Sequence, residues 1–306
     1  IYTGEDTLSL HDALPIYQAH PGDRVTFHGI DGNQPWYDSP IIQSFLAQAA
    51  PDVAPTLEAG LADCHGFGYS SIEEYVASGA DGAPFPQAAF DACTKGLSEL
   101  EAYFDANAAT LTANSSEKAL GWARIAVVGL RAWQFQRFYA DSDFLEFFES
   151  AEAARAEIFE RTRALAFPDA KAIVWADNTR LSQHHDLVDK PGLGKAVTMG
   201  TLLRQHLGEA YQAFGFVGYD VEINSPFEGM MSGEIPTDPA SIELALHGLG
   251  KPQLFVDLQS PALAGLVTPG QSYSVGTPKP SMLVPAEQFR ALFFLDHSPP
   301  MKALFY

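Results

Sequence analysis

A helical pattern that is apolar on nearly every side constrains this chain most. Residues 116–139 read SEKALGWARIAVVGLRAWQFQRFY, and Arg124, Arg131 and Arg137 are their conspicuous charges. A helix of this kind is normally buried on most of its faces, because its apolar surface leaves no side for water. Other elements must therefore surround it, and the chain is expected to form a packed domain of several layers.

Further helical patterns flank this segment. Residues 37–50 and 86–111 precede it, and residues 144–167 follow it. The last of these is amphipathic and carries many charges, so its charged side is expected to face solvent. These patterns together predict a helical section over about residues 37–167.

From Lys171 onwards the pattern changes to short strands alternating with short helices. Strands are predicted for AIVWA, AYQAFGFVGYDV, PQLFVDL and FRALFFLD, and helices for SIELALHGLG and for TMGTLLRQHLG, which ends at Gly208. Such alternation favours an α/β fold, in which helices flank a layered sheet. Residues from about 171 to 306 are therefore expected to form an α/β section.

Acidic residues come at the ends of three predicted strands. RVTFHGID, residues 24–31, reads as a further short buried strand ahead of the helices. Asp31, Asp177 and Asp257 each come at or just after the last residue of such a strand. Because ligands of α/β sheets bind beyond the carboxyl ends of the strands, a cleft is predicted at the strand ends that carry Asp31 and Asp177.

The charge of the chain argues against two classes of partner. With 38 acidic and 18 basic residues, its formal net charge is −20. That field repels nucleic acid and anionic membrane surfaces. No apolar run is long enough to cross a membrane. A small-molecule substrate is the expected partner, and the oligomeric state is left open.

The first residues differ in origin from the rest of the chain. Residues 1–16 contain TLSLHDALPI, which is a one-frame translation of the sequencing adapter ACTCTTTCCCTACACGACGCTCTTCCGATC. We therefore expect residues 1–16 to be non-native and the natural chain to begin near Tyr17, inside its gene. Any signal peptide would lie upstream of that point, so location in the bacterial cytoplasm and export are both left open.

The two cysteines allow two interpretations. Cys64 and Cys93 lie in one polar, glycine-rich region, and a disulfide between them would suit an exported protein. Two free thiols in a cytosolic protein are the alternative. Their spacing is not that of a metal site.

Six sequence blocks together resemble the erythromycin esterase family. They are GDRVTFHGIDG, VWADN, MGTLLRQHLGEAYQAFGF, PASIELAL, LFVDL and FRALFFLDHSPP, and they follow the family's order at about its spacing. The resemblance implies a single domain, of which residues 17–306 are the larger, C-terminal part. It also implies hydrolysis of a macrolide lactone without a metal or other cofactor, by water that a His activates. The family's principal His and Glu are expected upstream of this sequence.

The resemblance also implies a site at a strand end, where the family carries a Trp-Ala-His-Asn-x-His motif. Aligned on Trp175, Ala176 and Asn178, this chain has Asp177 and Arg180 at the two His positions. Arg stays protonated and an ordinary Asp stays ionised at neutral pH, so an ion pair would replace a proton-transferring pair. Asp177 and Arg180 are the candidate catalytic residues, and a purely structural ion pair is the alternative.

Five residues are candidates for substrate binding. They are His28, Asp31, Asn178, Arg124 and His184. For His28 the alternative is a packed core residue, and for Arg124, as for Arg131 on the same helix, it is neutralisation of an internal acid.

A metal site is not expected. His184, His185 and Asp186 suggest one at first sight, but adjacent residues of an extended segment point to opposite faces, so both His residues cannot readily bind one ion. A serine hydrolase is not expected either, because the G-x-S-x-G elbow is missing from the sequence.

Two functions are therefore compared. The first is a divergent hydrolase of an ester or lactone, with a macrolide-like substrate and a role in the bacterial response to antibiotics implied by the resemblance. The second is a non-catalytic ligand-binding protein on the same scaffold. The altered motif is a reason not to assume erythromycin itself as the substrate.

Overall fold

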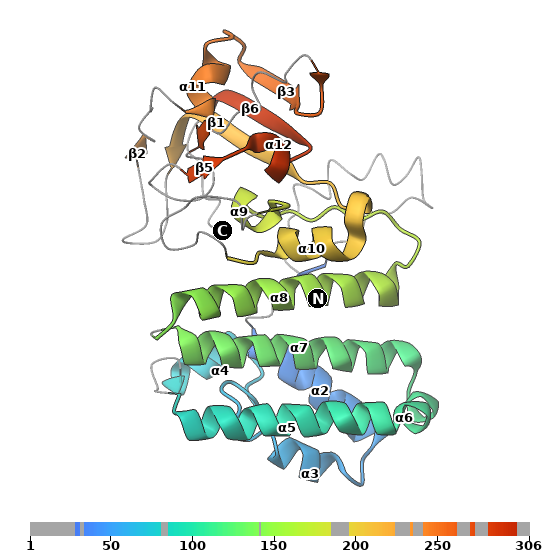
Figure 1. Ribbon diagram of the computed structural model, residues 1–306. Helices are drawn as coiled ribbons and strands as arrows, with labels where there is room; N and C mark the ends of the chain where they lie inside the picture. Colours follow the sequence, from blue (N-terminus) through green and yellow to red (C-terminus); the bar gives the residue numbers. More distant parts are fainter. Residues whose placement is uncertain are drawn as a thin grey trace.

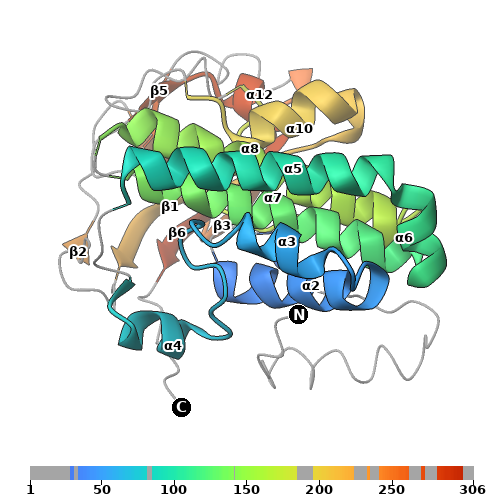
Figure 2. The same ribbon diagram turned by 90° about the horizontal axis from the view of Figure 1, so that it is seen from below.

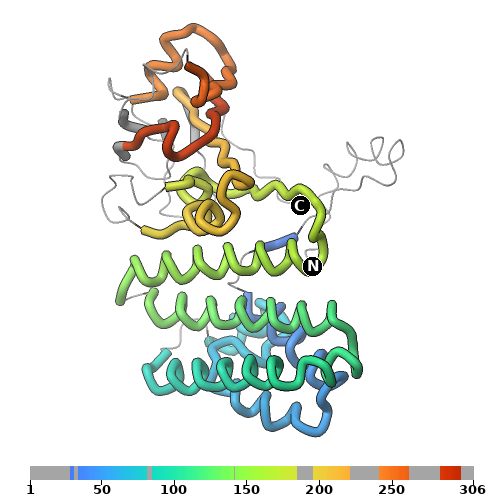
Figure 3. The backbone as a smooth tube through the Cα atoms, turned by 45° about the vertical axis from the view of Figure 1, so that its right-hand side comes forward, coloured from blue at the N-terminus to red at the C-terminus, as the bar shows by residue number. Residues whose placement is uncertain are grey.

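The chain forms a stack of helices with a small sheet beyond it (Figure 1). This computed structural model describes residues 28–30, 34–80, 85–140, 142–184, 196–223, 233–234, 241–261, 270–272 and 281–298. Figure 3 separates the helical section, in blue to green, from the α/β section, in yellow to red. The change of pattern near Lys171 therefore marks a change of architecture.

The helical section is built around α7. Its helices are α2 (Pro35–Ala49), α3 (Ala54–Ala59), α4 (Ile72–Ala77), α5 (Gln87–Ala106), α6 (Ala108–Asn114), α7 (Glu117–Tyr139) and α8 (Phe144–Ala166). α7 packs against α8 on one side and against α2 and α5 on the other (Figure 1; Figure 2). Leu120, Val127 and Leu130 are among its buried side chains. The predicted burial of residues 116–139 is confirmed.

The boundary between α5 and α6 corrects a prediction. The sequence predicts one helix over residues 86–111, but the helix stops at Ala106 and a second begins at Ala108. At Asn107 the side-chain Nδ2 donates to the carbonyl of Tyr103 at 3.0 Å, in addition to the backbone N–H. A side chain that competes in this way for backbone partners favours the end of a helix.

The α/β section alternates short helices and strands. Its elements are α9 (Asn178–Leu181), α10 (Met199–Leu207), a 3-10 turn (Gly208–Ala210), β1 (Phe214–Ile223), β2 (Gly233–Glu234), α11 (Ile242–His247), β3 (Gln253–Asp257), β4 (Gly270–Ser272), β5 (Ser281–Leu283), α12 (Pro285–Gln288) and β6 (Ala291–Ser298). Within the described residues one sheet has the order β2-β1-β6-β3, and β4 pairs with β5. β1 and β6 are parallel. This arrangement matches the predicted helix-flanked sheet.

Helix α10 begins and ends where the sequence predicts. The Thr198 side chain accepts a hydrogen bond from the N–H of Thr201 and caps the first turn. Gly208 ends the helix with a φ of +56°, a left-handed conformation that glycine adopts at little cost. The predicted helix and its stop are confirmed.

One face of the sheet forms the second core of the molecule. Val217, Leu292 and Phe294 of the central strands pack with Met199 and Leu203 of α10. α10 in turn lies against α8 (Figure 1). α8 is therefore the layer that joins the sheet to the helical section.

The predicted strand AIVWA is not a strand in the structure. Residues 171–177 belong to no helix or strand. Ile173 is 94% exposed and Trp175 is 81% exposed, whereas Val174 and Ala176 pack against the core below the sheet. The alternation of a strand is present, but within the described ranges no strand pairs with this segment.

Asp257 is the last residue of β3, as the sequence predicts, and the direction of β3 decides which edge of the sheet Asp257 occupies. β3 runs antiparallel to β6, with Asp257 opposite Ala291 at the start of that strand. Asp257 therefore lies at the amino-terminal edge of β1 and β6, and it forms an ion pair with Arg290. It does not lie at the carboxyl edge where ligands of parallel sheets bind.

Cys64 and Cys93 form a disulfide, which joins the loop after α3 to α5. Of the two interpretations that the sequence allows, the structure has the bonded pair.

No helix within the described ranges is both long and apolar enough to cross a membrane.

Candidate functional site

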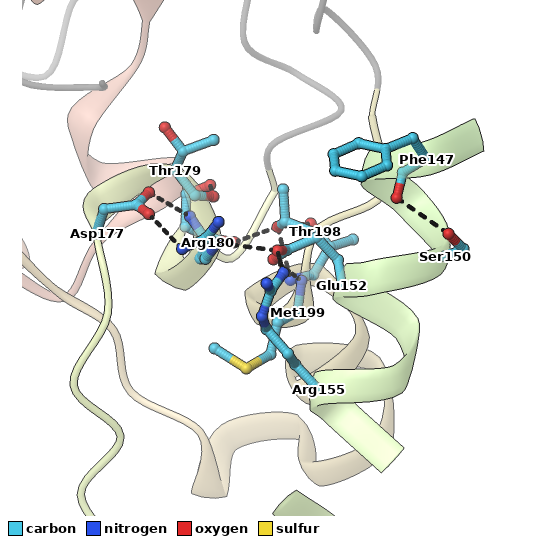
Figure 4. A network of polar contacts seen from close by, with 11 residues as sticks. Phe147, Ser150, Glu152, Arg155, Asp177, Thr179, Arg180, Thr198 and Met199 are labelled. Atoms are coloured by element: carbon cyan, nitrogen blue, oxygen red, sulfur yellow. Dashed lines mark hydrogen bonds and ion pairs between the residues drawn. The ribbon is translucent and has the colours of Figure 1, made fainter. Parts of the chain in front are cut away.

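Asp177 and Arg180 form the ion pair that the sequence predicts. Asp177 precedes α9 and caps it, because its Oδ1 accepts a hydrogen bond from the backbone N–H of Arg180 at 3.1 Å. The Arg180 guanidinium turns back and places Nη1 3.2 Å from Asp177 Oδ2 (Figure 4). Both carboxylate oxygens of Asp177 are thus engaged by one residue.

A buried carboxylate from α8 holds the other side of Arg180. Glu152 is fully buried, and its Oε1 accepts a hydrogen bond from Arg180 Nε at 3.0 Å. The same oxygen lies 2.5 Å from Arg155 Nη1, and its Oε2 accepts from the N–H of Met199 at 3.1 Å. A buried charge is tolerated only with such partners, and here three donors surround it.

The start of α10 is held to α8 by acidic side chains. In addition to the bond from Met199 to Glu152, the N–H of Val197 donates to Glu149 Oε1 at 2.8 Å. The first N–H groups of a helix have no partner within the helix, and negative charge there is favourable. α8, α9 and α10 are therefore fixed together around Glu152 (Figure 4).

Part of the Arg180 guanidinium remains available. The side chain is 37% exposed, and among the described residues its Nη2 has no hydrogen-bond partner. An arginine whose other nitrogens are fixed presents that N–H group at a defined place, where it can bind a carbonyl oxygen or a carboxylate. No histidine in the described part of the chain bonds to Asp177, Arg180 or Glu152.

Asn178 connects this site to the sheet. Its Nδ2 donates to the carbonyl of Phe216 at 2.6 Å, and its Oδ1 accepts from the N–H of the same residue at 2.9 Å. The amide thereby bonds to β1 as a neighbouring strand would. The predicted contact of Asn178 with substrate stays a prediction, while its bonds to β1 fix where α9 begins.

Arg124 lies apart from this site. It forms an ion pair with Asp105 of α5, with 2.7 Å between Nη2 and Oδ1. Arg131 pairs with Glu101, which also lies on α5. Both therefore pair with acids of α5. Asp105 is 70% exposed, so it is not an internal acid, and a ligand contact of Arg124 stays a prediction.

His28 also lies away from Glu152. Its ring packs 4.9 Å from that of Phe167 and is stacked on Trp122, but the residue is exposed rather than buried in the core. Partial burial lowers its pKa. Phe167 ends α8, and a helix rises about 1.5 Å per residue, so this end is roughly 22 Å from Glu152.

The remaining predicted residues lie at or beyond the limits of the described chain. The loop after α9 is fixed where the carbonyl of His184 accepts from Gln288 Nε2 at 2.8 Å. Asp31, His185 and Asp186 lie outside the described residues. Across the described ranges no group of three or more His, Cys, Asp and Glu residues is placed to hold a metal ion.

Sequence reasoning missed Glu152. It lies on a helix whose many charges predict a solvent-facing side, yet Glu152 and Arg155 are buried. The one signal is a small residue next to Arg155, since Ala156 packs with Met199 and Leu203 of α10.

The sequence also did not predict two His–Asp pairs at the edge of the sheet that lies away from α9. His247 Nδ1 donates to Asp296 Oδ1 at 2.6 Å, and the His247 ring stacks on Tyr219 with centroids 3.8 Å apart. Beside them, His297 and Asp220 are partners across β6 and β1, 2.8 Å apart. These pairs lie near the carboxyl ends of β1 and β6, away from α9.

Three solved structures have the same fold as this chain. A solved structure of a Bacillus cereus protein has a TM-score of 0.73 and 15% identity, covering 95% of this chain and 71% of that one. A succinoglycan biosynthesis protein has a TM-score of 0.69 and 15% identity, covering 95% and 69%. A mutant of the erythromycin esterase EreC in its open conformation has a TM-score of 0.71 and 17% identity, covering 97% and 75%.

Comparison of the sequence with family models identifies the family. The model described as erythromycin esterase matches residues 1–298. That range includes residues 1–16, whose non-native origin stays a prediction. No curated protein sequence matches the chain. With a family model matched over nearly its whole length and the fold of a solved esterase, the chain belongs to the erythromycin esterase family.

Proposed function

We propose that this protein hydrolyses an ester or lactone, macrolide-like in class, without a metal, and that Arg180 binds the carbonyl oxygen of the substrate. The observation that carries this proposal is the fixed guanidinium. Asp177 and Glu152 hold two of its nitrogens, and Nη2 is left without a partner among the described residues. Family membership supplies the reaction class.

The proposed role of Arg180 follows from the charge that hydrolysis creates. When water adds to the carbonyl carbon, the carbonyl oxygen becomes an oxyanion. A donor already fixed at that position stabilises the transition state without reorganising. Glu152 and Asp177 serve to orient Arg180, and Glu152 is shielded from competing water because it is fully buried.

A separate group must take the proton from water. Asp177 is a poor choice, because Oδ1 and Oδ2 both accept from Arg180. The resemblance implies that a His is the family's principal base, and no described His bonds to Asp177, Arg180 or Glu152. We therefore assign Arg180 to oxygen binding and assign no described residue as the base.

The second candidate is ligand binding without turnover. The observation that favours it is the ion pair itself, since Asp177 and Arg180 replace two residues that could transfer protons. Such a site would bind a carboxylate or an ester through Arg180 and leave it unchanged.

One pair of variants separates the candidates. Arg180→Gln removes the proposed donor, and Arg161→Gln removes an arginine of similar exposure, 39% against 37%, that pairs with Glu157 elsewhere on α8. Turnover of a chromogenic ester is measured on a chain in which the residues encoded upstream in the gene replace residues 1–16. Binding of a non-hydrolysed ester analogue is measured by isothermal titration calorimetry.

The outcomes distinguish the candidates. Hydrolysis predicts turnover that falls by about 100-fold or more in Arg180→Gln and stays unchanged in Arg161→Gln. Binding alone predicts no turnover, with affinity that Arg180→Gln weakens. Turnover that is equal in the two variants would contradict the assignment of Arg180.

A further inference from the structure

Helix α9, which carries Arg180, is too short to hold its own direction. Its four residues form a single turn, and an isolated helix of that length is not stable in water. Glu152 and Asp177 fix the guanidinium of Arg180. The backbone of α9 needs partners of its own, because the guanidinium keeps a defined place only if the helix that carries it does.

Both ends of α9 are bonded to one short stretch of chain, residues 211–216. At the start, the Asn178 amide makes its two bonds to the Phe216 backbone. At the end, the hydroxyl of Tyr211 donates to the carbonyl of Leu181 at 2.7 Å. A carbonyl in the last turn of a helix has no donor within the helix, and here the Tyr211 hydroxyl is that donor.

Tyr211 is itself held in place. Its side chain is 9% exposed and belongs to the core that packs β1 on α10. Its backbone N–H donates to the carbonyl of Gly208 at 3.2 Å, at the end of the 3-10 turn. Burial raises the pKa of Tyr211 far above its usual value. The hydroxyl therefore stays protonated, and stays a donor, throughout the pH range of an enzyme assay.

Helix α10 lies against the same end of α9 (Figure 1). A Cβ atom at Gly200 would lie 2.5 Å from the carbonyl oxygen of Leu181, so the first turn of α10 packs directly on this carbonyl. A shift of the carbonyl toward α10 is blocked by that contact. A shift away from Tyr211 is opposed by the hydrogen bond.

We propose that Tyr211 is a positioning residue for Arg180, which holds α9 through the Leu181 carbonyl and so places Nη2 where the carbonyl oxygen of the substrate binds. This inference rests on the proposed function, since it adds a requirement to the role of Arg180. Leu181 directly follows Arg180, so a displaced Leu181 carbonyl moves the Arg180 backbone. A misplacement of about 1 Å can cost about 100-fold in rate.

Tyr211→Phe tests the bond, because it removes the hydroxyl and keeps the ring. Tyr75→Phe is the matched control. Tyr75 is 1% exposed, and its hydroxyl bonds to His65 Nδ1 at 3.2 Å in the helical section. Each variant loses a buried hydroxyl, so each should lower the melting temperature by roughly 2–6 °C. Both are made in the chain that carries the residues encoded upstream in the gene.

The first measurement does not depend on turnover. The Nε–H group of Arg180 donates to Glu152, and its nuclear magnetic resonance signal is assigned by its loss in Arg180→Gln. Exchange of this proton with water should become at least about 10-fold faster in Tyr211→Phe, because the helix end is released. It should stay unchanged in Tyr75→Phe.

The second measurement is ester turnover between about pH 6 and 9. In Tyr211→Phe, kcat should fall by about 10-fold or more while KM changes by less than about 3-fold, because the oxyanion forms only in the transition state. Since Tyr211 stays protonated, the loss should be the same at every pH. A loss confined to one side of the pH profile would overturn the proposal, because Tyr211 would then be an acid or a base in the reaction.

The two measurements separate this inference from the proposed function. If the parent turns over no ester but Tyr211→Phe speeds the exchange at Arg180, the positioning role is supported and hydrolysis is contradicted. If turnover depends on Arg180 while Tyr211→Phe and Tyr75→Phe behave alike, hydrolysis stands and the positioning role is overturned. In a parent that turns over, a change in exchange without a change in kcat, or the reverse, would also overturn it.

Discussion

Glu152 is the residue on which the candidate site is organised. It accepts hydrogen bonds from Arg180 and Met199 and pairs with Arg155, so one carboxylate connects three helices. Removal of the acid from a buried ion pair leaves positive charge that is no longer compensated there. Glu152 should therefore matter more for stability than any exposed acid of α8.

Glu152→Gln is expected to destabilise the protein by about 3–5 kcal/mol, because Arg155 and Arg180 lose their shared negative charge. Urea unfolding measures this loss. The control Glu157→Gln disrupts the exposed pair with Arg161 and should cost about 1 kcal/mol or less. Equal losses in the two variants would contradict the organising role of Glu152.

Asp38 is a second residue whose charge state has consequences. It lies where α2 crosses α7, and a side chain at Gly129 would collide with its carboxyl group. Burial raises the pKa of Asp38 from 3.8 to about 8. The neutral acid therefore fits this crossing, and the ionised form opposes folding. Its contribution to stability is complete below pH 4 and is lost as the pH rises through about 8.

Asp38→Asn should consequently stabilise the protein by an amount that grows as the pH rises from about 4 to 8. Its free energy of unfolding should exceed that of the parent by roughly 2–4 kcal/mol at pH 8 and by almost nothing at pH 4. Thermal unfolding at a series of pH values measures the difference. Asp63→Asn, at an exposed position, should show no such trend. A gain that is independent of pH would show that folding does not raise the pKa of Asp38.

At the scale of elements, the disulfide should stabilise the helical section. Cys64 and Cys93 are 29 positions apart, and closing a loop of that size stabilises a fold by about 3 kcal/mol. The double variant Cys64→Ala and Cys93→Ala should lose about this much in urea unfolding. A reductant should destabilise the parent and leave the variant unchanged. Two reactive thiols in the native parent would contradict the bond.

The junction of α9 with β1 makes another prediction. Asn178→Ala removes both hydrogen bonds to the Phe216 backbone, and unsatisfied buried groups cost about 1–3 kcal/mol each. The amide of Phe216 should then exchange with deuterium faster than in the parent, while amides of α7 should not change. Unchanged exchange at Phe216 would show that the junction does not depend on this amide.

Helices were predicted better than strands, for a physical reason. Ser116 and Thr198 cap α7 and α10 through bonds to residues three positions away, so the signal lies within the sequence itself. The segment AIVWA has the alternation of a strand, but whether it pairs depends on partners elsewhere. The antiparallel direction of β3 likewise has no local signal. The sequence therefore predicts that Asp257 ends a strand, but not which edge of the sheet it occupies.

At the scale of the whole molecule, α8 is the element that relates the two sections. It packs on α7 with one side and meets α9 and α10 with the other (Figure 1). The sequence predicted the two sections and the Asp177–Arg180 pair, because both leave patterns along the chain. It did not predict Glu152, because only packing shows that this charged residue is buried.

Hydrolysis of a macrolide lactone in heavy-oxygen water, followed by mass spectrometry, tests the central claim most directly. The chain carrying the upstream residues is expected to open the lactone and place one heavy oxygen in the new carboxylate. Arg180→Gln should slow this by about 100-fold or more, and Arg161→Gln should not. A lactone that binds but stays closed, or one that opens equally fast without Arg180, would contradict the account.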